Sequence, residues 1–84
     1  MSKIDKLLAR IRQNPKTVRF DELDAVLLRY GFSKRRKGSH VFYARGELRF
    51  GFPVPHPGPH VAPFYVKQFT AFMDEVLREE DSSA

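Results

Sequence analysis

The residues best suited to chemistry form one short run, Lys34-Arg35-Arg36-Lys37-Gly38-Ser39-His40. A histidine, with an unperturbed pKa of about 6.5, can accept or donate a proton near neutral pH. RNA cleavage needs little more: a base removes the proton of a 2′-hydroxyl, the oxygen attacks the adjacent phosphorus, and cations stabilise the developing charge. We therefore expect His40 to be the acid or base. The predicted phosphate-binding residues are Lys34, Arg35, Arg36, Lys37, Gly38 and Ser39.

Other chemistries have weaker support in the sequence. Without cysteine, the chain has no disulfide, thiolate zinc site or cysteine nucleophile. His56 and His60 are four residues apart, but the prolines between them prevent a helical pair of metal ligands, and residues 48–73 contain no acidic residue. We expect no metal site and no cofactor, and His56 is a distant candidate for a second acid–base group.

The orientation of His40 is open from the sequence. In a regular strand His40 and Phe42 share one face, and Phe42 has the character of a core residue. Either the strand begins after His40, or Val41 and Tyr43 point inward. Tyr43 is a candidate for stacking on or positioning a substrate, and core packing explains it equally well. The alternative to a catalytic role is a structural one, in which His40 is a strand residue hydrogen-bonded at the edge of the sheet.

Length and charge favour a small domain with a polyanionic partner. The 84 residues allow a single domain, 1–84, whose small core leaves little room for a deep cofactor pocket. Residues 1–73 hold 14 basic against five acidic side chains, a net charge of +9, whereas residues 74–84 hold one against five, a net charge of −4. A merely cationic surface would fit the same charge.

The compartment expected from the sequence is the cytoplasm. The absence of cysteine fits a reducing, intracellular compartment. The chain has neither an apolar run of about 18 residues nor a signal-like N-terminus, so we expect no membrane association.

Hydrophobic periodicity and turn residues predict an α+β fold of order α-α-β-β-β-α, in which a three-stranded antiparallel sheet has helices on one face. Ser2 and Asp5 can cap the first helix, Gly31 can end the second in a left-handed conformation, and Arg45-Gly46 can form a hairpin turn. The predicted helices are 2–13, 21–30 and 63–78, the strands 32–36, 40–44 and 48–52, with a stiff connector at 53–60 and a frayed tail at 79–84.

Three ordered segments resemble the HicA family, small toxins of bacterial and archaeal toxin–antitoxin modules. Residues 37–43, KGSHVFY, resemble the K-G-S-H-x-x-[YF] signature. Residues 27–32 resemble the family's helix end and L-x-x-x-G-F entry into the first strand, and residues 53–56 its V-P-x-H stretch. The similarity covers about residues 18–78, and helix 2–13 resembles the longer variant of the family. The Phe- and Pro-rich stretch 49–59 and the extra His60 depart from its pattern.

The resemblance implies a double-stranded-RNA-binding-like fold and an endoribonuclease that cleaves mRNA, with the family's catalytic histidine at His40. It also implies a HicB-like antitoxin as protein partner. Two other functions fit the same residues: a non-catalytic RNA-binding module of this fold, and a protein-interaction module that uses the open face of the sheet.

Overall fold

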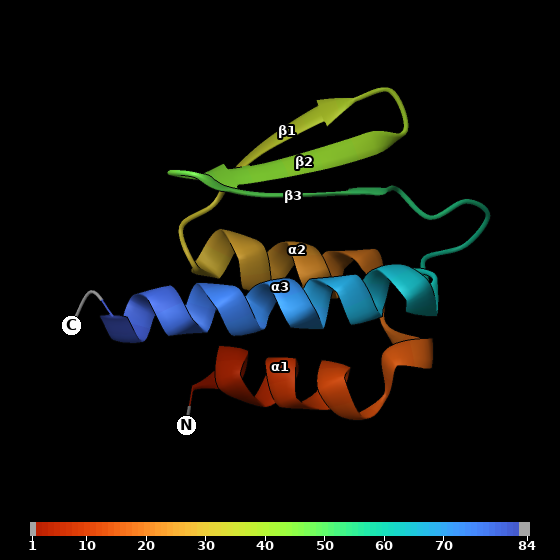
Figure 1. The fold of residues 1–84 in the computed structure, drawn as a ribbon. Helices are drawn as coiled ribbons and strands as arrows, with labels where there is room; N and C mark the ends of the chain where they lie inside the picture. The colour runs from red at the N-terminus through yellow and green to blue at the C-terminus, as the bar shows by residue number, and fades with distance from the viewer. Residues whose placement is uncertain (1, 83–84) are drawn as a thin grey trace.

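The described part of the chain, residues 2–82 (for residue 82 the backbone alone), contains three α-helices and a three-stranded sheet in this computed structural model (Figure 1). The order along the chain is α-α-β-β-β-α, so the predicted α+β fold is confirmed. The elements are α1 (Lys3–Gln13), the short 3-10 helix η1 (Pro15–Thr17), α2 (Phe20–Arg29), β1 (Ser33–Lys37), β2 (His40–Arg45), β3 (Leu48–Pro53) and α3 (Pro63–Ser82).

The elements form layers. The sheet has the order β1-β2-β3 with both pairs antiparallel, and α2 and α3 lie against one of its faces (Figure 1). Helix α1 packs on the opposite side of this helix pair, away from the sheet (Figure 1). The second face of the sheet, which we call the outer face, is therefore uncovered.

Local signals in the sequence set the helix ends. The Ser2 hydroxyl accepts from the Asp5 amide at 3.1 Å, and the Asp5 carboxylate accepts from the Ser2 amide at 3.2 Å, which is the capping box expected for α1. Helix α2 ends at Arg29, and Gly31, which follows the C-cap residue Tyr30, has a φ of +88°. The Phe32 amide donates to the Leu27 carbonyl at 3.1 Å, and this turn leads the chain into β1.

Two glycine turns connect the strands. Gly38-Ser39 joins β1 to β2 and Gly46-Glu47 joins β2 to β3. Each glycine is the first of two turn residues and has a positive φ, +60° for Gly38 and +59° for Gly46, as type II′ hairpin turns require. The second turn lies one residue later than predicted, because Arg45 pairs with Leu48 and belongs to β2.

The core lies between the sheet and the helices and continues down to α1. Val41 and Tyr43 of β2 face α2 and α3, and Leu8 and Ile11 of α1 close the opposite side. All sixteen buried hydrophobic residues form one cluster, and no buried side-chain polar atom of the described residues lacks a hydrogen-bond partner. None of the helices within residues 2–82 is long and apolar enough to cross a membrane.

Helix α3 continues to Ser82, past the end at residue 78 predicted from the sequence and into the stretch expected as a frayed tail. The carboxylate of Glu80 accepts from the guanidinium of Arg45 in β2 at 2.7 Å, which ties this last turn of the helix to the sheet. Residues 83 and 84 of the predicted tail lie outside the described residues.

Candidate functional site

The turn at Gly38-Ser39 decides which side of the sheet His40 occupies. Because the turn has two residues, His40 is already the first residue of β2 and pairs directly with Lys37. Val41 and Tyr43 are then the inward pair, each only 1% exposed, whereas His40 and Phe42 face outward. The view of Phe42 as a core residue is wrong: its side chain is 44% exposed.

Pairing register assembles nine residues on the outer face of the sheet. By strand alternation, one residue from each strand stands side by side in every row. The three rows are Lys37–His40–Pro53, Arg35–Phe42–Gly51 and Ser33–Ala44–Arg49. Three of the nine are cations and none is acidic. His40 thus lies on a surface that favours an anion.

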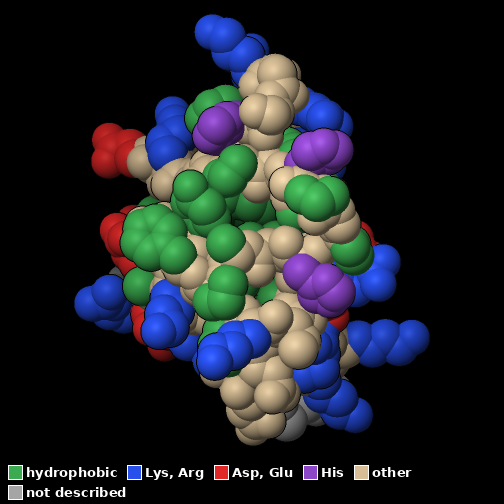
Figure 2. Space-filling model, turned by 90° about the vertical axis from the view of Figure 1, so that its right-hand side faces the viewer, with side chains coloured by type: hydrophobic (Ala, Val, Ile, Leu, Met, Phe, Trp, Pro, Cys, Tyr) green, Lys and Arg blue, Asp and Glu red, His purple; other side chains and the backbone are tan. Residues whose placement is uncertain are grey.

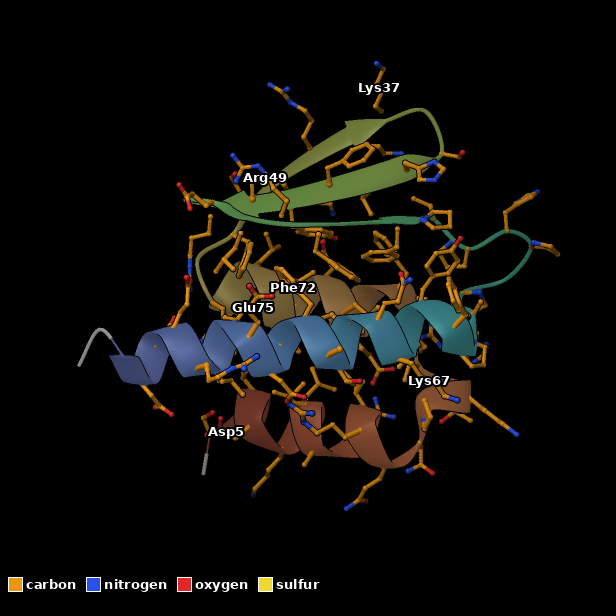
Figure 3. The ribbon with its side chains drawn as sticks, in the orientation of Figure 1. Asp5, Lys37, Arg49, Lys67, Phe72 and Glu75 are labelled. Carbon is orange, nitrogen blue, oxygen red and sulfur yellow. The ribbon has the colours of Figure 1, made fainter. Side chains whose placement is uncertain are left out.

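A shallow groove runs over this face. Residues from all three strands line it, among them Arg35, Lys37, His40, Phe42 and Arg49. Lys37 and Arg49 project from the side of the sheet that faces away from the helices, whereas Phe72 of α3 lies on the helix side of the sheet (Figure 3). At the end of the molecule where β1 turns into β2, histidine side chains lie beside apolar ones, with Lys and Arg around them (Figure 2).

Strand alternation divides the run of four cations. Arg35 and Lys37 stand on the outer face, whereas Lys34 and Arg36 pair with Tyr43 and Val41 of the inner face. The Lys34 ammonium lies 2.9 Å from a carboxylate oxygen of Asp24 in α2 and 5.3 Å from the centre of the Phe20 ring. Lys34 also lines the groove, but its ammonium is held toward Asp24 of α2, so the structure does not bring the four side chains together.

Two hydrogen bonds hold the turn before His40. The Gly38 carbonyl accepts from Nε of Arg36 at 3.1 Å. The Ser39 carbonyl accepts from the amide of Val54 at 2.7 Å, which ties the turn to the chain leaving β3. With both carbonyls bonded, the position of His40 at the head of β2 is fixed from two sides.

Tyr43 is part of the core. Its hydroxyl donates a 2.5 Å hydrogen bond to the carboxylate of Asp24. Burial raises the pKa of the Tyr43 phenol, and the hydrogen bond to Asp24 and its negative charge raise that pKa further. Of the two roles considered for Tyr43, core packing is the one that its burial and contacts support.

The other two histidines lie in the connector after β3. His56 is exposed, and His60 forms an isolated β-bridge with Arg19. Neither lines the groove over the outer face. Within residues 2–82, no three His, Cys, Asp or Glu side chains converge into a group that could hold a metal ion.

Sequence reasoning missed three residues of this surface: Phe42 as an exposed ring, Arg49 and Gly51. Arg49 alternates with the buried Leu48 and half-buried Phe50, a signal that places it on the open face. Gly51 and Phe42 become neighbours only through the β2–β3 register, which depends on the length of the second turn.

Comparison with known proteins places the chain in a family. The family model described as HicA toxin of bacterial toxin-antitoxin matches residues 20–75, more than half of the chain, and α1 lies before the matched region. Searches among curated proteins and among solved structures found no match. The match spans α2, the whole sheet and most of α3, including the run from Lys34 to His40. The chain belongs to the HicA toxin family, toxins of bacterial toxin–antitoxin systems, and an antitoxin is its implied partner.

Proposed function

We propose that this toxin is an endoribonuclease that cleaves mRNA without a metal ion or other cofactor, with His40 as the general acid and base. The observation that carries the proposal is the placement of His40. It is exposed at the head of β2, on a sheet face that holds Arg35, Lys37 and Arg49 and no acidic residue. An mRNA substrate would make the cytoplasm the place of action.

The proposed reaction is a transesterification. The His40 imidazole takes the proton of a 2′-hydroxyl, and the 2′-oxygen forms a bond to the adjacent phosphorus. The bond from phosphorus to the 5′-oxygen breaks, and the leaving oxygen takes the proton back from the imidazolium. The products are a 2′,3′-cyclic phosphate and a 5′-hydroxyl end. His56, which does not line the groove, remains the more distant candidate for the second proton transfer.

Cations beside His40 would stabilise the charge on the phosphoryl oxygens during this step. Lys37 is the direct strand partner of His40, and Arg35 stands one row away, so these two are our proposed phosphate contacts. Gly38 and Ser39 would let the RNA backbone approach the turn. Arg36 and Lys34 are the weaker candidates, because they bond to Gly38 and Asp24 respectively.

The proposed protein partner is a HicB-like antitoxin that covers the outer face. The family match implies an antitoxin, and covering this face would exclude RNA from His40. Neutral or acidic residues on the antitoxin would match the charge of the surface.

The deciding experiment compares His40→Ala with the wild-type protein on a purified RNA. We expect cleavage to fall at least 100-fold, within the range for loss of a general acid or base, while RNA binding persists. End analysis of the wild-type products should show 2′,3′-cyclic phosphates. The matched control, His60→Ala, changes a histidine outside the groove and should cleave normally.

A non-catalytic RNA-binding module of the same fold is the second candidate, favoured by the basic outer face alone. It predicts that purified wild-type protein binds RNA and leaves it intact. If His40→Ala cleaves RNA and arrests growth as the wild type does, the assignment of catalysis to His40 fails.

A further inference from the structure

Phe42 is an exposed aromatic ring in the middle row of the outer face, and each of the three rows holds one cation. It belongs to the central strand, yet 44% of its surface is accessible, and it lies in the groove beside His40. The centres of the two rings are 6.1 Å apart and their planes are within 19° of parallel. A large apolar side chain in this position gains little from burial, so its presence calls for another explanation.

Gly51 makes room for the Phe42 ring. A Cβ atom at Gly51 would lie 2.8 Å from Cδ1 of Phe42 and 3.2 Å from its Cε1, closer than side chains tolerate. The φ of Gly51 is not positive, so its backbone does not require glycine. Glycine within a strand costs stability, and here it lets the ring lie across β3.

Basic residues stand in the row of Phe42 and in the rows on either side of it. Arg35 stands beside Phe42 in the same row, Lys37 lies in the row of His40, and Arg49 in the row beyond. These three rows span about 13 Å along the strands and about 10 Å across them, the scale of a few nucleotides. An aromatic ring among cations in an open groove is the arrangement by which proteins bind unpaired nucleic acid.

We propose that the outer face of the sheet binds single-stranded RNA, with Phe42 stacking on an unpaired base next to the cleaved phosphate. The proposal rests on the proposed function and names its substrate class. Arg35 and Lys37 bind the backbone beside Phe42, and Arg49, whose guanidinium also donates to the Gly46 and Leu48 carbonyls, is the weaker contact. Phe42 is a positioning residue that sets the scissile phosphate against His40. A base within a duplex has no free face to offer Phe42, so paired RNA is a poorer ligand.

Binding is measured with a 2′-O-methyl RNA 10-mer, which has no nucleophilic hydroxyl and therefore reports binding whether or not the protein cleaves RNA. The expected result is an affinity lower by about 5- to 150-fold in Phe42→Leu, the range for removal of one base–aromatic stack. Phe42→Trp should restore most of the affinity. A 2-aminopurine base in the 10-mer should be quenched by the wild type and by Phe42→Trp, and less by Phe42→Leu.

Two further variants separate stacking from folding. Phe64→Leu removes another exposed ring, 63% accessible and on α3, and should bind as the wild type does. Gly51→Ala keeps Phe42 but displaces its ring, and should weaken binding in protein that melts as a folded domain. Unchanged single-strand affinity in Phe42→Leu, or tighter binding of the duplex form of the 10-mer by the wild type, would overturn the proposal. Loss of cleavage in His40→Ala does not affect this measurement.

Discussion

At the scale of single residues, Asp24 shows how the outer face is supported from below. Its carboxylate accepts from the Tyr43 hydroxyl at 2.5 Å and lies 2.9 Å from the Lys34 ammonium. Tyr43 is the inward neighbour of Phe42 in β2, so the contact with α2 holds the strand that carries Phe42 and His40. The sequence leaves this role open, because the face that Tyr43 occupies depends on where the strand begins.

Replacing Tyr43 with phenylalanine should lower stability and change its dependence on pH. Losing a hydrogen bond to a carboxylate should cost about 1 to 3 kcal/mol in unfolding free energy at neutral pH. Because the folded-state pKa of Tyr43 is raised above its ordinary value of 10.0, the wild type binds this proton more tightly than the unfolded chain does. Its contribution is complete below pH 10 and declines as the pH rises above it.

Urea unfolding of both proteins at neutral pH and at alkaline pH tests this expectation. The wild type should lose more stability than Tyr43→Phe between the two, because only the wild type carries this phenol. Tyr65→Phe, which removes a hydroxyl without a hydrogen bond to any described residue, is the matched control. Equal alkaline losses in the wild type and Tyr43→Phe would contradict the role given to the hydroxyl.

At the scale of elements, side-chain alternation along strand β1 places the two lysines of the basic run on opposite faces of the sheet. Lys37 stands on the outer face beside His40, whereas Lys34 contacts Asp24 and Phe20. Lys37→Gln should leave stability unchanged, weaken RNA binding and reduce the slope of log affinity against log salt by about 0.7. Lys34→Gln should cost about 0.5 to 1 kcal/mol in stability and leave the salt slope as it is.

Titration of RNA affinity against salt, together with thermal melting, distinguishes the two lysine variants. An equal loss of affinity in both variants would mean that RNA contacts Lys34 and Lys37 alike. That result would contradict the assignment of RNA binding to the outer face only. The two variants change the same residue type in the same strand, so each is the control for the other.

The elements also show where sequence reasoning succeeds and where it stops. The order of helices and strands follows from periodicity and from local signals such as the Ser2–Asp5 cap, and His40 is a candidate because of its residue type and its neighbours. The face of each residue depends on where the strand begins, and a two-residue turn at Gly38-Ser39 settles that. Contacts such as Phe42 over Gly51 depend on register between strands, which local patterns do not carry.

At the scale of the whole molecule, α1 and the candidate site lie on opposite sides. Helix α1 lies before residue 20, where the family match begins, and packs on α2 and α3, while RNA is expected on the outer face of the sheet (Figure 1). Its Ile11 is fully buried, and Arg12 pairs with Asp74 of α3 at 2.7 Å. The helix thus enlarges the hydrophobic core of a domain whose core is small because the chain is short.

This separation predicts that stability and RNA binding respond to different changes. Ile11→Val removes one methylene group from the core and should cost about 0.5 to 1.5 kcal/mol, lowering the melting temperature by several degrees. RNA affinity and cleavage, measured well below the melting temperature, should match the wild type, because the layer of α2 and α3 stands between Ile11 and the sheet. A loss of affinity in folded Ile11→Val protein would instead mean that α1 sets the geometry of the outer face. Lys37→Gln is the opposite case, with unchanged melting and weaker binding, so the two variants together locate function on one layer of the molecule.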